Sequence, residues 1–453
     1  MQIQFLGATN TVTGSKFLIT SGNRNILVDC GLFQGYKQLR LHNWAPLPIA
    51  PSKIDAVILT HAHLDHSGYI PILVRDGFKG KIYCSEATRD LCGLLLPDSG
   101  YLLEEEASYA NRKGFTKHQP ALPLYTEKDA ERALPYLTPV DFRKPFDVAG
   151  HFRAELFPAG HILGAAIVKL EAEDTSVTFS GDLGRSNDPI MVDPAPIETS
   201  DYLLMESTYG NRFHDPADPL ELLGRTIRET AARGGVTIIP SFAVGRAQAL
   251  LYYIHQLKQS GAIPALLPVY LNSPMAVDAT TLYRKHNRLH RLSPKECEMI
   301  YRDIRVVNSV AESIALDKQR MPMVIVAASG MATGGRVLHH LKSFAPDPRN
   351  TILFAGFQAG GTRGAAMLNG VESIKIHGQY TPLRAQVTQI PNLSAHADRG
   401  ELMAWLSHFK QPPKRTFLVH GEPDAADSLR QHIEETMDWS CYVPDYLESI
   451  TLD

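Results

Sequence analysis

Apolar and polar positions alternate along the chain in two different ways. In the first section, short β-branched runs are separated by Gly, Ser and Asn turns, which is typical of consecutive strands. A longer helical pattern occupies 86–114, with leucines on one face and Gly114 as its stop. A buried strand over 54–60 leads into a cluster of histidines. Further strands are expected at 2–8, 16–20, 25–29, 81–85, 154–157, 166–171, 176–179 and 202–205.

After Glu206 the pattern changes to strands that alternate with helices. A helix that ends at Gly234-Gly235 precedes an apolar strand over 236–240, and another helix begins near Arg246. The same order continues with strands at 269–271, 323–328 and 351–355 and a helix near Val337. Such alternation predicts a parallel sheet covered by helices. We therefore expect this section to form its own domain, and the earlier style returns with a strand at 416–419.

Composition narrows the class of protein without identifying it. With 453 residues, of which 44% are hydrophobic and 21% charged, the chain is expected to form two or three ordinary globular domains. No apolar run approaches the ~20 residues that span a bilayer. The amino terminus enters a strand without a charged leader, and the five cysteines form no CxxC pair, so we expect a cytoplasmic protein. The net charge of −3 gives no general attraction to nucleic acid, although a local basic groove stays open.

The run Thr60-His61-Ala62-His63-Leu64-Asp65-His66 places four metal-binding side chains at the end of a buried strand. In an extended segment His61 and His63 share one face, whereas Asp65 lies where a helix is expected to begin. This layout suits two neighbouring metals better than one. The alternative is a His-rich surface turn without metal. We favour metal, because four such residues beside a buried strand cost stability unless something binds them.

Four further polar residues end apolar strands beside glycine or polar turns. They are His161, Asp182, Glu206 and His420. Taken singly each is weak, because a histidine at a strand end is more often a hydrogen-bonded scaffold residue and a Gly-Asp turn is common. Together with the histidine cluster they complete the ligand shells of two metals.

At this point the chain resembles a known family. The strings His61-x-His63-x-Asp65-His66, Gly160-His161, Gly181-Asp182 and Val419-His420-Gly421 resemble the metallo-β-lactamase fold. Met205-Glu206-Ser207-Thr208-Tyr209, Ser394-Ala395-His396-Ala397-Asp398 and the terminal His420 resemble the motifs of its β-CASP nuclease branch. That branch includes RNA-processing nucleases of bacteria and archaea. The resemblance implies an α/β fold: an αββα sandwich from 1–207 and 391–453, with a parallel-sheet β-CASP domain inserted at 208–390.

The resemblance also implies a role for each motif residue. His61, His63 and His161 would hold one zinc ion, Asp65, His66 and His420 a second, and Asp182 would bridge two Zn²⁺ per chain. Asp29 would support the metal loop. Glu206 and His396 would form an acid–base pair, with Asp65 also counted among the catalytic residues. The alternatives are a salt bridge from Glu206 to Arg212 and a helix-cap hydrogen bond for His396.

Two loops of the middle section follow strands in a way that suits phosphate. The segment 241–248 opens a helix whose backbone N–H groups can bind an anion, and 329–336 is rich in glycine. The second is no Walker A loop, because the Gly-Lys-[Ser/Thr] ending is missing. A Gly-rich loop alone is most often a tight turn, but two loops facing a dinuclear site favour a clamp for a nucleic-acid backbone, and both resemble β-CASP phosphate-binding segments. The candidates are Ser241, Arg246, Ser329, Gly330, Gly334, Gly335 and Arg336.

Two neighbouring features are left outside the site. For the pair His339-His340 we expect a solvated helix face, since no metal spacing fits. Asn272 stands where relatives often carry Asp, which leaves no specific role expected for this position.

The favoured function is a zinc-dependent ribonuclease that uses a metal-activated hydroxide in a dinuclear site between two domains, with single-stranded RNA as partner. His420 at the last motif resembles the RNA-acting branch. The alternatives are a small-molecule hydrolase of the lactamase or thioesterase type and a DNA-acting β-CASP nuclease. A non-catalytic RNA-binding subunit is disfavoured because every expected ligand is present. The residues leave open endo- or 5′-exonucleolytic cleavage and the oligomeric state, with a homodimer as one option.

Overall fold

A computed structural model describes residues 1–114, 118–356, 358 and 360–453. The chain folds into two compact units. The first unit combines Met1–Phe213 with His396–Asp453, and the second consists of His214–Ala395. The two units divide at 213/214 and 395/396, and the domain boundaries at 207/208 and 390/391 stay a prediction from the sequence.

The first unit contains two seven-stranded sheets. One sheet has the order β22 (Ser449–Thr451), β1 (Gln2–Phe5), β2 (Phe17–Ser21), β3 (Arg24–Val28), β4 (Ala56–Ile58), β5 (Lys81–Cys84), β6 (Leu137–Pro139). The other has the order β21 (Cys441–Tyr442), β20 (Arg415–Val419), β11 (Tyr202–Glu206), β10 (Thr175–Phe179), β9 (Ala166–Ala172), β8 (Phe152–Pro158), β7 (Phe146–Val148). Strands β3 to β6 run parallel to one another, as do β10, β11, β20 and β21.

The core of the first unit lies between these sheets. The alternating strand residues Phe5, Phe17 and Val28 point inward from one sheet and meet Phe179 and Phe417 from the other. The ring centroids of Phe5 and Phe417 are 5.5 Å apart, and those of Phe17 and Phe179 are 6.0 Å apart. Phenylalanine rings at these distances make favourable contacts in addition to the area that they bury.

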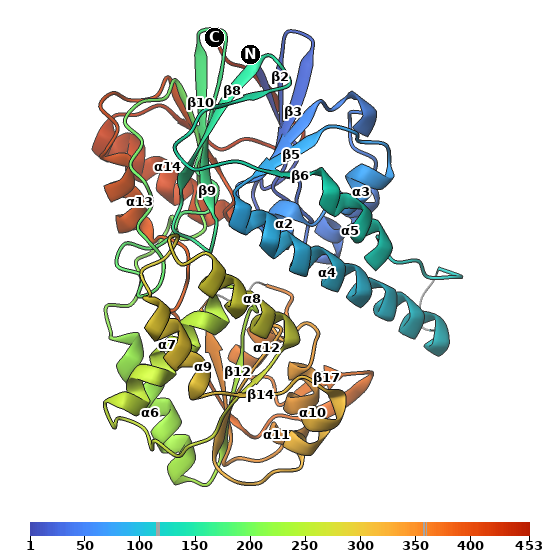
Figure 1. The fold of residues 1–453 in the computed structure, drawn as a ribbon, viewed down its shortest axis with the longest axis vertical. Coiled ribbons are helices and arrows are strands. Elements are labelled where there is room, and N and C mark those ends of the chain that lie inside the picture. The colour runs from blue at the N-terminus through green and yellow to red at the C-terminus, as the bar shows by residue number, and fades with distance from the viewer. Residues whose placement is uncertain (115–117, 357, 359) are drawn as a thin grey trace. The chain divides into compact units, whose positions relative to one another are not determined.

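Helices cover the outer faces of both sheets (Figure 1). On the first sheet they are α2 (Leu64–Ser67), α3 (Ile70–Arg75), α4 (Glu86–Lys113) and α5 (Glu127–Ala133). The same unit contains the short helix α1 (Lys37–Leu41), which has no buried residues, and 3₁₀ turns at His42–Trp44, Pro51–Lys53 and Leu134–Tyr136. On the second sheet the helices are α13 (Arg399–Leu406) and α14 (Pro423–Met437). The predicted αββα sandwich is therefore confirmed.

The long predicted helix is also confirmed, as α4. It begins where the Ser85 hydroxyl accepts a hydrogen bond from the Thr88 N–H, and it ends at Gly114, whose φ of 62° suits a residue without Cβ.

The second unit is built on a six-stranded sheet. Its order is β14 (Arg305–Val306), β13 (Val269–Asn272), β15 (Met323–Ala327), β12 (Val236–Pro240), β16 (Thr351–Ala355), β19 (Gln386–Ile390), and all pairings are parallel. A separate hairpin joins β17 (Ser373–Ile376) to β18 (Gln379–Pro382). The helices are α6 (Pro219–Ala232), α7 (Arg246–Gln259), α8 (Pro274–Lys285), α9 (Pro294–Arg302), α10 (Val310–Asp317), α11 (Val337–Phe344) and α12 (Arg363–Leu368). Helices α6, α7 and α9 lie on one side of the sheet, and α10 and α11 on the other (Figure 1). The predicted parallel, helix-covered sheet is thus confirmed.

Candidate metal centre

The metal-ligand candidates of the first unit come from the ends of its strands. Thr60 and His61 follow β4, whereas Asp182 follows β10 and His420 follows β20. Because β10, β11 and β20 are parallel, their carboxyl ends meet at one edge of the second sheet. His161 reaches the same place from the turn between β8 and β9. The fold therefore gathers side chains that are far apart in the sequence.

Three imidazoles and one carboxylate form the first group of donor atoms. The Nδ1 atom of His63 lies 3.1 Å from His61 Nε2 and 3.3 Å from His161 Nε2. The Oδ2 atom of Asp182 is 3.5 Å from each of those two Nε2 atoms. Zinc bonds of about 2.0–2.1 Å in a tetrahedron would separate the ligand atoms by about 3.3 Å. The spacing of this group fits a single tetrahedral cation.

A second group of donor atoms meets the other oxygen of Asp182. The Nε2 atoms of His66 and His420 are 3.2 Å apart, and Asp65 Oδ2 lies 3.4 Å from the His420 Nε2. Asp182 Oδ1 is 3.3 Å from His66 Nε2, but among the described residues no donor meets it in hydrogen-bond geometry. A buried carboxylate oxygen in this situation is costly unless a cation or a proton occupies the space that it faces.

The charge states of four of these groups also fit a cation. Burial lowers the pKa of His61 well below its ordinary value and that of His63 to about 4, so both imidazoles are neutral. Burial alone would raise the pKa values of Asp65 and Asp182. The histidines around them have the stronger effect, and they lower the pKa of Asp65 to about 2 and that of Asp182 well below its ordinary value. Neutral imidazoles and ionised carboxylates are the forms that bind divalent metals.

Hydrogen bonds from outside the cluster fix the orientation of the histidines. Asp29 Oδ2 lies 2.8 Å from His66 Nδ1, and Asp29 also accepts from the N–H and the hydroxyl of Thr60 at 2.7 and 2.8 Å. Burial would lower the pKa of His66, but the charges of Asp182 and Asp29 raise it well above its ordinary value. Thr208 Oγ1 similarly lies 3.2 Å from His420 Nδ1. These contacts leave the Nε2 atoms of His66 and His420 directed into the cluster.

The backbone at two of these positions lies in the left-handed region. Asp29 has a φ of 61° and His420 a φ of 51°. Residues other than glycine adopt this conformation at a cost, and such strain is concentrated at functional sites.

The predicted pair Glu206 and His396 is in direct contact. Glu206 Oε2 lies 2.9 Å from His396 Nδ1, and the Leu183 N–H donates to Glu206 Oε1. The Nε2 atom of His396 lies 3.9 Å from Asp182 Oδ2. Burial would lower the pKa of His396, but the negative charges of Glu206 and Asp182 raise it to about 9. Of the groups named in the alternatives, Arg212 lies over the Tyr209 ring, and the Asp398 side chain caps α13.

The phosphate-binding candidates lie in the second unit, at the carboxyl ends of β12 and β15. The two loops are neighbours, because the Ser241 N–H donates to Ala327 O at 2.9 Å. Within the second loop, Ser329 Oγ accepts from the N–H groups of Thr333 and Gly334 at 3.2 and 3.3 Å. Both candidate arginines are held by protein groups: Arg246 donates to Ala355 O, and Arg336 to three acceptors. Their role toward phosphate stays a prediction.

One expectation about this unit is wrong. His340 is fully buried rather than solvated, whereas His339 is exposed as expected. His340 Nδ1 lies 2.6 Å from Asp317 Oδ1, and the Asn272 amide donates to His340 Nε2 at 2.7 Å. The Asn272 carbonyl oxygen accepts from Arg336 at 2.7 Å. Asn272, for which no role was expected, therefore links the Gly-rich loop to the core of the second unit.

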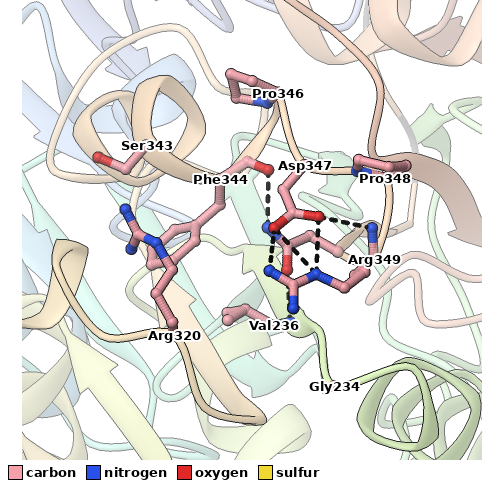
Figure 2. Close-up of a pocket in the computed structure, with 10 residues that line it drawn as sticks. Gly234, Val236, Arg320, Ser343, Phe344, Pro346, Asp347, Pro348 and Arg349 are labelled. Atoms are coloured by element: carbon pink, nitrogen blue, oxygen red, sulfur yellow. Dashed lines mark hydrogen bonds and ion pairs between the residues drawn. The ribbon is translucent and has the colours of Figure 1, made fainter.

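A surface pocket of about 310 Å³ lies at the opposite edge of this sheet (Figure 2). Its lining includes Val236 at the start of β12, Asn350 just before β16, and the ion pair between Arg349 and Asp347 at 2.7 Å. None of the predicted site residues lines it. Ligands of open α/β sheets bind at the carboxyl ends of the strands, and this pocket lies at the amino ends.

Comparison with known proteins agrees with the fold. The model of the metallo-β-lactamase superfamily matches residues 11–233, which defines the class of protein. The model of the Beta-Casp domain matches 247–367, and that of the Zn-dependent metallo-hydrolase RNA specificity domain matches 380–444. The chain thus belongs to the β-CASP family of metallo-hydrolases.

Two curated relatives extend this assignment over nearly the full chain. Ribonuclease TTHA0252 of Thermus thermophilus is 36% identical over 94% of this chain and 94% of its own length. Transcription termination factor FttA of Methanosarcina mazei is 31% identical over 100% of this chain and 72% of its own length. A solved structure, a protein of unknown function from Enterococcus faecalis V583, shares the fold with a TM-score of 0.55 at 14% identity, covering 100% of this chain and 99% of its own.

Two points complete the description of the site. Among the helices that the structure describes, none has both the length and the apolar character needed to cross a membrane. Sequence reasoning missed Thr60 and Thr208 as partners of the histidines. Their position directly before His61 and two residues after Glu206 was the available signal.

Proposed function

We propose that this protein is a zinc-dependent ribonuclease that hydrolyses phosphodiester bonds of single-stranded RNA. The observation that carries the proposal is the convergence of seven metal-binding side chains with the Glu206–His396 pair beside them. The match to an RNA specificity domain and the name of the ribonuclease relative support RNA as the substrate.

The ligand assignment follows the two groups of donor atoms. His61, His63 and His161 would hold one Zn²⁺, and Asp65, His66 and His420 the other, with one oxygen of Asp182 directed to each. When bound, the two cations would supply Lewis acidity toward a phosphodiester and lower the pKa of water.

His396 is proposed as the general acid. Its Nδ1–H donates to Glu206, so a protonated ring carries its second proton on Nε2, on the side that faces Asp182. A pKa of about 9 keeps the ring protonated at neutral pH, and the proton can pass to the departing oxygen of RNA. Glu206 orients the ring and stabilises its charge.

Asp65 is proposed to combine two roles, as a metal ligand and as an acceptor that orients substrate or water. The loops of the second unit that carry Ser241, Ser329, Gly330, Gly334 and Gly335 would bind the RNA backbone. Arg246 and Arg336 would add positive charge there.

The test compares purified protein on labelled single-stranded RNA and DNA of one sequence, with bound metal measured by mass spectrometry. We expect RNA cleavage, about two zinc ions per chain, and loss of both activity and one zinc in His66→Ala and His420→Ala. Equal or faster cleavage of DNA would overturn the RNA assignment. Hydrolysis of a thioester or lactam without any nuclease activity would instead favour the small-molecule hydrolase.

Two finer expectations belong with this proposal. Light scattering of the purified protein tests the homodimer, and fractionation of the source cells tests the cytoplasmic location.

A further inference from the structure

One surface segment of the first unit combines exposed aromatic and basic side chains. Tyr36 is 55% exposed and Trp44 is 58% exposed, and Lys37 and Arg40 are exposed on the helix α1 between them. Tyr446, 39% exposed, joins them because its ring lies 4.7 Å from that of His42. We call these five residues, Tyr36, Lys37, Arg40, Trp44 and Tyr446, the aromatic–basic surface.

This surface is tied to the metal loop by a short series of hydrogen bonds. Asn43, next to Trp44, is buried. Its side-chain oxygen accepts from the Phe33 N–H at 2.9 Å, and its NH₂ group donates to Phe33 O at 2.7 Å. Leu32 donates its N–H to Leu64 O at 2.8 Å, and Leu64 precedes Asp65. Since neighbouring Cα atoms are 3.8 Å apart, the path from Asp65 to Trp44 measures at most about 25 Å. Stacked nucleotides cover this distance in roughly seven steps or fewer.

The charge of the segment suits a polyanion. Residues 30–54 contain no Asp or Glu, although the whole chain carries 48 acidic and 45 basic residues. Lys37, Arg40 and Lys53 are the charged residues of this stretch. Asp445, exposed beside Tyr446, is the nearest acidic residue along the chain to that ring. The excess of positive charge is therefore local, in a protein with a net charge of −3.

We propose that the aromatic–basic surface binds bases of the single-stranded RNA substrate outside the metal centre, with Trp44 as a stacking platform. This inference rests on the proposed function. Exposed aromatic rings cost solvation unless they meet a partner, and every nucleobase offers a π-face to stack on. Lys37 and Arg40 contact the phosphates of the same strand, which fixes the strand beside the rings.

Trp44 also provides the measurement. It is one of three tryptophans, and the other two, Trp405 and Trp439, are buried. The zinc-loaded full-length protein is titrated with a single-stranded oligoadenylate of about 12 nucleotides whose phosphorothioate linkages slow hydrolysis. We expect quenching of the tryptophan emission with the RNA and much less quenching with an abasic strand of equal charge.

Substitutions at Trp44 test whether its indole ring is responsible for the RNA binding. Trp44→Ala is expected to raise the Kd for the oligoadenylate about fivefold or more, whereas Trp44→Phe keeps a stacking ring and changes it much less. Tyr380→Ala is the matched control, because Tyr380 is an exposed aromatic residue on β18 of the second unit. In RNA cleavage Trp44→Ala should raise KM and leave kcat, and it should leave hydrolysis of bis(p-nitrophenyl) phosphate unchanged.

The outcomes separate this inference from the proposed function. Binding of RNA by Trp44→Ala as tightly as by the wild type would overturn the stacking proposal, and it would favour a protein partner for the surface. An equal loss in Tyr380→Ala would also overturn it, since the effect would then not belong to this surface. Failure of the wild type to cleave any RNA would refute the proposed function, whereas quenching by base-containing RNA alone would still support stacking.

Discussion

Replacing Asp29 by Asn should weaken one metal position and spare the other. The carboxylate accepts three hydrogen bonds: two from Thr60 and one at 2.8 Å from His66 Nδ1. An amide at this position offers one acceptor oxygen and one donor NH₂ group. With the oxygen facing the Thr60 N–H, the NH₂ group faces the Nδ1–H of His66, and two donors oppose each other. His66 then favours the tautomer that carries its proton on Nε2, the atom that should bind the metal.

The size of the effect follows from the geometry of the two groups. Loss of a carboxylate that orients a metal-binding histidine typically weakens metal binding about 10- to 100-fold, or about 1.4–2.7 kcal/mol. The metal affinity should fall mainly at the site formed by Asp65, His66 and His420. His61 contacts the Thr60 hydroxyl at 3.1 Å and reaches Asp29 only through that hydroxyl, so the position of His61, His63 and His161 should lose much less affinity.

The assay is a zinc titration against a competing chromophoric chelator, which resolves two affinities per chain. Asp201→Asn is the matched control, because Asp201 also accepts from an N–H and a hydroxyl, those of Ser176 at 2.9 and 2.6 Å, and contacts no histidine among the described residues. Both variants should lose similar folding stability. Equal weakening of both zinc affinities in Asp29→Asn, or no weakening of either, would refute the tautomer argument.

Three further predictions concern catalysis, charge burial and metal removal. His396→Ala should lower turnover about 10²- to 10⁴-fold while bound zinc stays near two per chain, and loss of zinc would show that His396 is a ligand instead. Burial lowers the pKa of Lys16 to about 8 from 10.5, so the folded state releases this proton first as pH rises. The free energy of unfolding of the first unit should therefore gain about 3 kcal/mol between pH 8 and 10.5. Lys16→Met should lack this gain in urea titrations, Lys37→Met should retain it, and parallel curves for Lys16→Met and the wild type would contradict the assignment. Removing zinc that was present at 100 times its Kd should destabilise the first unit by about 2.7 kcal/mol for each of the two positions, measured by tryptophan emission because all three tryptophans lie in that unit. Unchanged stability on chelation would argue against metal at this site.

Much of the fold was predictable because its signals are local. The strand 236–240 and the helix that begins at Arg246 are continuous patterns with clear stops, and the structure has them at those residues. The grouping of Asp182, Glu206 and His420 was predictable because parallel strands bring their carboxyl ends together.

The rest depends on tertiary contacts that leave no periodic signal. His340 is buried because Asn272 and Asp317, 68 and 23 residues away in the chain, supply its hydrogen bonds. The hydrogen bonds of Arg336 likewise go to acceptors at 272, 307 and 308, which no motif predicts. Such partners are chosen by the packing of the finished domain.

The position of His420 after the second unit in the chain has a consequence for synthesis. All four residues of the first donor group, from His61 to Asp182, leave the ribosome before the second unit is made. The second donor group is complete only after His420 has been synthesised and its strand β20 has paired with β11. A nascent chain can therefore complete the first donor group before the inserted unit folds, and the second donor group only after the chain has returned to the first unit. Nuclease activity that needs both donor groups would thus be withheld until β20 and His420 have been translated.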